Sequence, residues 1–279
     1  MAEEASAKRH CGQTSGQSSN LDVVHVPGQK REYTVTLKGV ALHGKETLEV
    51  VCTSEPDKTD EMISRIRRSA CGSYPHIMGV DVEFTKDDEP PQMPAVLQIS
   101  VEGLCLVYHI AAATKCEVVS ELGLVLFSPP KKLKNLVKQR PKRLKELLQE
   151  EKLFTFAGFS IKNDRDKLKL SGLEINPNKH IDIQRNWRVP YNGKLYDSLA
   201  NVAASVIHPF YSKMKKKIDR EANHKLWGDS PLPDYLIEYA AIDAYATYKS
   251  WKIIDNIKRG LEISKEQEAD PYYHCHYAG

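Results

Sequence analysis

Two carboxylates inside an otherwise apolar run constrain the fold of this chain more than any other feature. The run extends from His76 to Glu83 and carries Asp81 and Glu83 among residues that are typical of a central strand. Side chains alternate along a strand, so both acids point to one face while Val82 points into the opposite layer. A solvated strand edge would also tolerate such a pair, but the apolar neighbours on both sides favour burial. Because unpaired buried charge is costly, the run predicts a sheet face that binds one or two cations.

Two further acids occupy comparable apolar surroundings elsewhere in the chain. Asp164 follows a predicted strand that ends at Gly158, and Asp243 lies on the same helix face as Tyr239, one turn away. Asp166 is a weaker candidate, because on a helix it would face away from Asp164. Four carboxylates gathered in one place repel each other unless cations neutralise them. The set therefore predicts a cage for hard divalent metals and phosphoryl-transfer chemistry, in which the Tyr239 hydroxyl orients a water molecule or helps to deprotonate it.

The order of predicted strands and helices indicates an α/β domain built on a mixed sheet. Apolar patterns predict strands at 32–37, 48–53, 76–83, 96–101, 104–110, 154–159 and 180–183, of which the first two should form an antiparallel pair. The strands at 96–101 and 104–110, joined through Gly103, should be antiparallel partners of the central strand at 76–83. Helical spacing predicts helices at 57–68, around 144–148, and at 162–170, 195–207 and 234–258, the last ending before Gly260. Residues 1–30 are expected to be a disordered leader, 31–260 the single folded domain and 261–279 a C-terminal tail.

Composition argues against several classes of protein. No apolar stretch approaches the roughly 20 residues that a membrane span needs, and the first residues lack the apolar core of a secretory signal. The six cysteines form no C-x-x-C pair, which argues against a structural zinc site and favours a reducing compartment. We therefore expect a protein of the nucleus, the cytoplasm or both. The basic stretch 138–143 is either a nuclear address or a solvated loop.

In this order, the three acidic segments resemble a known family, the 3′–5′ exonucleases of the DEDD superfamily. The resemblance is to the tyrosine subclass (DEDDy), which has a ribonuclease H-like fold, and within it to the Werner-syndrome-type exonuclease domain in its small standalone plant form. It covers about residues 31–259. The matching segments are Asp81-Val-Glu83 with Val96-Leu-Gln-Ile99, Gly158-x-x-Ile161-x-x-Asp164-x-x-Lys167-Leu168, and Tyr239-Ala-Ala-x-Asp243-Ala-Tyr-Ala246.

The resemblance implies a metal-dependent 3′–5′ exonuclease on a ribonuclease H-like mixed sheet flanked by helices. The family's ligands for two Mg²⁺ or Mn²⁺ ions match Asp81, Glu83, Asp164 and Asp243. Tyr239 matches the residue that positions the attacking water. Two such cations would activate that water and stabilise the leaving 3′ oxygen, so that nucleoside 5′-monophosphates are released. Trp227 matches a structural tryptophan, whereas Phe84 stands where relatives often carry Trp.

Two basic clusters are candidate contacts to a nucleic-acid backbone. One spans residues 131–145, and the other comprises Lys213, Lys215, Lys216, Lys217 and Arg220. A bound single strand needs a positive groove and stacking faces, yet a run of charge is usually a solvated face, and the net charge of +3 is too small to decide between them. The second cluster precedes the predicted catalytic helix in the chain, which favours it as a substrate contact.

The sequence leaves alternatives to this reading open. A catalytically weak or inactive nucleic-acid-binding protein could be built on the same fold, although the presence of all four acids argues against it. An oligomeric scaffold, in which nuclease activity is secondary, is a second alternative. Sequence does not reveal subunit interfaces, so homo-oligomers remain open. The expected partner is single-stranded or 3′-recessed nucleic acid. DNA and RNA both remain open, since contacts to the 2′-hydroxyl decide between them.

Overall fold

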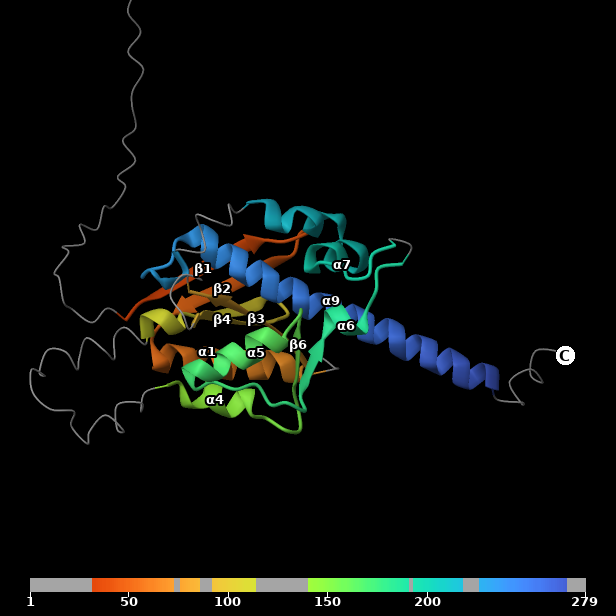
Figure 1. Ribbon diagram of the computed structural model, residues 1–279, viewed down its shortest axis with the longest axis horizontal. Helices are drawn as coiled ribbons and strands as arrows, with labels where there is room; N and C mark the ends of the chain where they lie inside the picture. The colour runs from red at the N-terminus through yellow and green to blue at the C-terminus, as the bar shows by residue number, and fades with distance from the viewer. Residues whose placement is uncertain are drawn as a thin grey trace, which may run out of the picture.

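The computed structural model describes residues 32–72, 76–85, 92–113, 140–190, 193–217 and 226–269 (Figure 1). The predicted leader and the basic residues 131–139 lie outside these ranges. The strands are β1 (Thr34–Ala41), β2 (Thr47–Thr53), β3 (Ile77–Phe84), β4 (Pro94–Val101), β5 (Leu104–Tyr108), β6 (Thr155–Gly158) and β7 (His180–Asp182). The helices are α1 (Pro56–Cys71), α4 (Lys142–Leu148), α5 (Lys162–Leu168), α6 (Ile183–Asn186), α7 (Leu199–Val206) and α9 (Asp234–Ala269), with shorter 3-10 segments η2 (Lys169–Ser171), η3 (Pro209–Lys217) and η4 (Leu226–Gly228).

All seven strands form one mixed sheet, in the order β1-β2-β5-β4-β3-β6-β7. The pairs β1–β2, β5–β4 and β4–β3 are antiparallel, whereas β2–β5, β3–β6 and β6–β7 are parallel. The predicted antiparallel pairing of the first two strands is confirmed, and so is that of β3 with β4. The sequence pattern also predicts β5 as a neighbour of β3, which is wrong. A tight turn with Gly103 at a φ of 67° returns β5 onto β4, and β6 takes the other side of β3 instead.

Helices cover both faces of the sheet (Figure 1). One face packs against α9, α7 and η3, and its core includes Val50, Val107 and the α9 residues Ala240, Ala241 and Ala244. The three alanines are completely buried, and their small side chains allow α9 to lie close to the sheet. The opposite face packs against α1, α4 and α5, whose apolar residues share a second core with those of β3, β4 and β5. The result is a three-layer α/β domain, as the sequence predicts.

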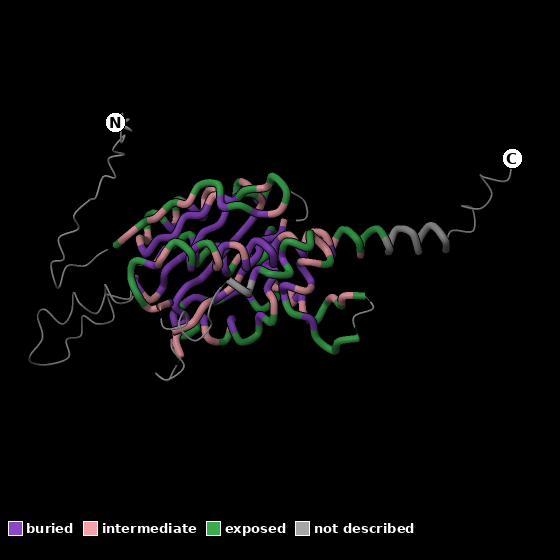
Figure 2. Tube along the Cα trace, turned by 90° about the horizontal axis from the view of Figure 1, so that it is seen from above, coloured by how far each residue is buried: buried purple, intermediate pink, exposed green. Residues whose placement is uncertain are grey.

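The helix α9 is longer than predicted. It has 36 residues and continues through Gly260 to Ala269, because a glycine inside a helix weakens it by only about 1 kcal/mol relative to alanine and does not have to end it. Figure 2 shows that the part of α9 over the sheet is buried and that the part before Gly260 becomes exposed. Despite its length, α9 is too polar to span a bilayer, and no other helix in the described ranges qualifies.

Candidate metal centre

The strand β3 presents two carboxylates on the face that α9 covers. Val80 and Val82 point into the core shared with α1, α4 and α5. Asp81 and Glu83 alternate with them and therefore point to the other side of the sheet. Both acids are half-buried. The period-two pattern in the sequence thus predicts the orientation of this pair correctly.

A glycine in β3 allows the backbone of α9 to lie directly on the strand. A Cβ atom at Gly79 would meet the Ala244 carbonyl oxygen at 2.2 Å and the Tyr248 amide nitrogen at 2.6 Å, which is closer than real Cβ atoms approach. Gly79 and Asp81 are two residues apart and share a face. The contact at Gly79 therefore brings Asp243, which precedes Ala244, over the acidic end of β3.

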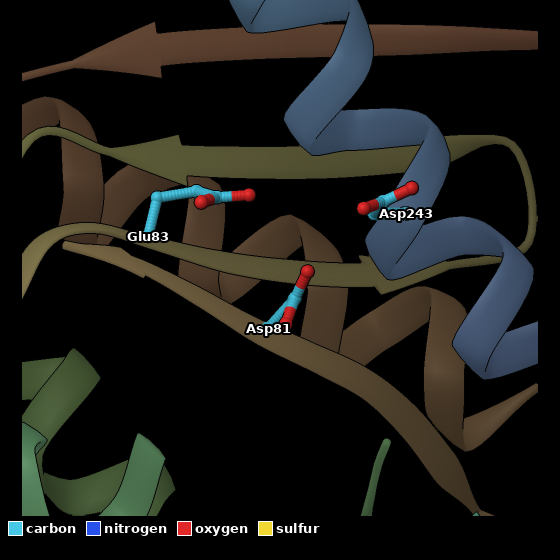
Figure 3. A group of neighbouring side chains, drawn as sticks. All are labelled: Asp81, Glu83 and Asp243. Atoms are coloured by element: carbon cyan, nitrogen blue, oxygen red, sulfur yellow. The ribbon is translucent and has the colours of Figure 1, made fainter. Parts of the chain in front are cut away.

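Three carboxylates meet where α9 crosses β3. Asp81, Glu83 and Asp243 each offer one oxygen, and these oxygens all lie within 4.8 Å of one another. Figure 3 shows the three side chains turned toward a common space, two from the strand and one from the helix. Asp243 is only 1% exposed, so the group is closed on the helix side. Oxygen donors at this spacing are the ligands that hard divalent cations prefer, and they repel each other without one. The residues present therefore fit a divalent cation.

Tyr239 lies one turn before Asp243 on α9, beside the same carboxylates. Burial raises the pKa of Tyr239 well above its usual range, and the negative charges of Asp243, Glu83 and Asp81 raise it further, together with a hydrogen bond to Asp243. The hydroxyl is therefore protonated at neutral pH and donates to Asp243. The helical spacing predicts the proximity of Tyr239 to Asp243, and the contact of α9 with β3 adds its proximity to Asp81 and Glu83.

Trp227 supports the Tyr239 ring from η4. The two ring centroids are 6.4 Å apart and the ring planes are tilted by 42°. Trp227 is 2% exposed, and its backbone carbonyl accepts a hydrogen bond from Nε2 of the buried His109 at 3.1 Å. A residue fixed in this way from both sides has a structural role, in agreement with the role that the sequence resemblance implies for Trp227.

Asp164 lies on α5 and is not a member of the three-carboxylate group. The turn into α5 is tight: a Cβ atom at Gly158 would meet Cδ1 of Ile161 at 2.4 Å. Ser160 has a left-handed φ of 58°, and its amide donates to Oδ1 of Asp182 at 3.0 Å. The Asp164 side chain is buried, and α5 contacts β3. Its assignment as a fourth ligand stays a prediction.

Of the predicted basic contacts to nucleic acid, only part lies within the residues that the structure describes. Lys213 is exposed on η3. The side chains of Lys215, Lys216 and Lys217, and the whole of Arg220, lie outside the described residues. The competing acid Asp166 is exposed on α5, which supports its lower rank as a ligand.

One positively charged side chain, Lys167, was not predicted as a substrate contact from the sequence. The Lys167 ammonium lies 4.5 Å from the centroid of the Phe84 ring and donates to Oε1 of Gln92. Phe84 directly follows Glu83 in β3 but packs against the core on the α1, α4 and α5 side, so this positive charge stands at the end of the strand, on the sheet face opposite to the carboxylates. The three-residue spacing of Asp164 and Lys167 on α5 was the available signal, because side chains so spaced are neighbours on a helix.

No protein-family model matches the chain, and no curated protein matches it. Among solved structures, the EXO domain of Nibbler from Aedes aegypti is similar, with a TM-score of 0.50 and 15% identity over 75% of this chain and 88% of that one. A second similar structure is NrnC from Brucella melitensis, with a TM-score of 0.43 and 15% identity over 71% of this chain and 79% of that one. A third is RNase D from Escherichia coli, an exoribonuclease involved in structured RNA processing. Its TM-score is 0.41, with 15% identity over 80% of this chain and 47% of that one.

At 15% identity, the likeness to the Nibbler EXO domain establishes the fold alone. The seven-stranded mixed sheet with helices on both faces is shared with that domain, and it confirms the α/β fold with a mixed sheet flanked by helices that the sequence predicts.

Proposed function

We propose that this protein is a metal-dependent exonuclease that removes nucleoside 5′-monophosphates from the 3′ end of nucleic acids. The proposal rests above all on one observation, the meeting of Asp81, Glu83 and Asp243 within 4.8 Å. The fold shared with an EXO domain supports it. Because one fold hosts many functions, we infer the activity from the chemistry of the three carboxylates and not from the fold.

The carboxylates would hold Mg²⁺ or Mn²⁺, and the resemblance to the DEDDy subclass implies two such ions. When bound, the ions lower the pKa of a water molecule and neutralise charge on the transferring phosphoryl group. Asp243 is almost fully buried, and Asp81 and Glu83 are half-buried. The helix thus closes one side of the group, and the strand side leaves access for the phosphate at the end of a nucleic-acid strand. We include Asp164 as the fourth ligand on the basis of the resemblance.

Tyr239 would orient the attacking water. Its pKa is raised by burial and by the neighbouring acids, so the phenol acts as a hydrogen-bond donor and acceptor and not as a phenolate base. The hydroxyl donates to the carboxylate of Asp243, and its oxygen can accept a hydrogen bond from a water molecule on the other side. The proton lost by the water passes to solvent or to a neighbouring carboxylate.

The substrate backbone needs positive charge in the surroundings of the site. Lys167, held over Phe84 at the end of β3 on the α5 side, would contact a substrate phosphate beyond the end of that strand. The more distant contacts would come from Lys213, Lys215, Lys216, Lys217 and Arg220. The bound nucleic acid would be single-stranded or have a recessed 3′ end, because the terminus of the nucleic-acid strand has to reach the carboxylates.

The test is cleavage of end-labelled strands and 3′-recessed duplexes of DNA and of RNA with Mn²⁺ or Mg²⁺. We expect a ladder of products shortened from the 3′ end, with nucleoside 5′-monophosphates as the released product. Asp243→Asn keeps the side-chain shape but removes a metal ligand, so activity should fall at least about a hundredfold. Asp166→Asn, an exposed acid on α5, is the matched control and should retain full activity.

The outcomes separate the proposal from its rivals. Full activity in Asp243→Asn would refute the site assignment. Binding of the strands without any cleavage by the unaltered protein would favour the inactive binding protein or scaffold, and the molar mass in solution would then show whether it assembles. Comparing DNA with the same strand carrying one 2′-hydroxyl at the terminal nucleotide decides the preferred sugar.

A further inference from the structure

A buried glutamine lies next to the metal centre, and its side-chain amide makes no hydrogen bond with any described residue. Gln98 is in the middle of β4 and is 0% exposed. Within the described ranges, no group hydrogen-bonds to its Oε1 or its Nε2. Buried polar atoms are almost always hydrogen-bonded in native proteins, and the exceptions cluster where a group serves a function or meets an ordered water.

The sheet register places this amide beside Asp81. Gln98 is the direct cross-strand partner of Asp81 in the antiparallel pair of β3 and β4, and residues opposite each other share a face with Cβ atoms about 4.5–5.5 Å apart. The next pair on the same face is Gly79 with Ser100, where α9 lies on the sheet. Gln98 therefore lies on the sheet face that α9 covers, beside Asp81.

The neighbours of Gln98 give no reason for an amide as a packing element. On its own face of the sheet, Val96 two positions before it in β4 and Val107 opposite it in β5 are fully buried and apolar, and the Ser100 hydroxyl two positions after it donates to backbone carbonyls. An apolar residue of the same length would fill this position without an unsatisfied amide. The reason for a glutamine must therefore be sought in its remaining neighbour on this face, the Asp81 carboxylate across the strand pair.

We infer that Gln98 is a positioning residue of the metal centre, whose amide N–H donates to the Asp81 carboxylate through one bridging water molecule and holds the ligating oxygen of Asp81 toward the cation. A carboxylate has about four lone-pair positions and a cation occupies only some of them. Partners that satisfy the rest orient metal ligands and raise metal affinity. The inference rests on the proposed function, because it gives Gln98 a role only if these carboxylates bind metal.

The experiment is Mn²⁺ binding to the full chain by calorimetry, which does not depend on catalysis. Gln98→Met keeps the length of the side chain and removes both polar atoms. We expect its Mn²⁺ dissociation constant to rise about 10- to 100-fold, the usual effect of removing a partner of a metal ligand. The unfolding midpoint in EDTA should not fall, since a buried unsatisfied amide has been replaced by an apolar group.

Ser250→Ala is the matched control. The Ser250 hydroxyl is also buried on α9 and also lacks a hydrogen-bonding partner among the described residues, but it lies about two turns beyond Asp243 on the helix. Its loss should leave Mn²⁺ affinity unchanged. If Gln98→Met binds Mn²⁺ as tightly as the unaltered protein, or if Ser250→Ala weakens binding equally, the inference is overturned.

A second variant keeps the test decisive if Gln98→Met does not fold. Gln98→Glu adds one more carboxylate beside Asp81, Glu83 and Asp243, so Mn²⁺ should raise its unfolding midpoint by more than it raises that of the unaltered protein. Equal shifts would contradict the placement of Gln98. Failure of the unaltered protein to bind Mn²⁺ at all is a different result, because it refutes the proposed function itself.

Discussion

Gly79→Ala tests whether the approach of α9 to β3 builds the metal centre. The new Cβ atom would lie 2.2 Å from the Ala244 carbonyl oxygen, 2.6 Å from the Tyr248 amide nitrogen and 2.7 Å from the Tyr248 Cβ atom. Two of these three atoms belong to the helix backbone, so no side-chain rotation relieves the clash. Ordinary contact begins at 3.4 Å. The helix and the strand must therefore separate by about 1 Å, as overpacked cores do at the expense of stability.

Two quantities should change together in Gly79→Ala. Overpacking of a core costs about 1–3 kcal/mol, and we expect a loss in the upper part of this range, because the obstructing atoms are backbone. Asp243 precedes Ala244 and moves with it, away from Asp81. A misplacement of about 1 Å at a catalytic centre can reduce turnover about a hundredfold. Urea unfolding measures the first change, and release of mononucleotides at saturating Mn²⁺ measures the second.

Gly260→Ala is the control for this prediction. It makes the same substitution on α9 itself, at a position where a Cβ atom meets nothing within 4 Å. Alanine favours the helix over glycine by roughly 0.5–1 kcal/mol, so stability should not fall and turnover should not change. Unaltered stability and turnover in Gly79→Ala would refute the idea that this glycine sets the position of Asp243.

Three further predictions address the site and its surroundings. Tyr239→Phe should slow turnover about a hundredfold at saturating Mn²⁺, since a positioned hydroxyl is lost, as release of mononucleotides would measure. Lys167→Met should raise KM for the nucleic acid and lower the slope of its binding against salt by about 1, because one phosphate contact near Phe84 is removed; an unchanged slope would exclude the contact. The Arg65 hydrogen bond lowers the pKa of Glu49 from 4.5. The stabilisation by this ion pair is therefore fully present above pH 4.5, and it is lost as the pH falls through the lowered pKa of Glu49. Glu49→Gln should reduce the free energy of unfolding by at most about 1 kcal/mol at pH 7. Urea titrations should show that the difference between the two proteins shrinks below pH 4.5.

Local periodicity accounts for the parts of the fold that were predicted well. Alternation along 76–83 predicts that Asp81 and Glu83 share a face, and the structure puts Val80 and Val82 in the opposite core. The end of α9 is the counter-example. Gly260 is a common stop signal, but a single glycine cannot outweigh the helix formers that follow it, and the helix continues to Ala269.

Non-local pairing accounts for what was missed. The position of β5 between β4 and β2 and the amide of Gln98 opposite Asp81 depend on which strands pair. Strand order follows from the whole set of connections and cores, and a short apolar segment is compatible with several neighbours. The burial of Gln98 without a protein partner is visible only when the strand is placed under α9.

The amino-acid sequence by itself determined the two halves of the candidate centre. Strand alternation sets Asp81 and Glu83 side by side, and helical spacing sets Tyr239 and Asp243 side by side. Only the tertiary structure decided that the halves meet, because they lie more than 150 residues apart in the chain and no local pattern encodes a contact over that separation. The physical reason that they meet is the missing side chain at Gly79, which lets the backbone of the helix rest on the strand.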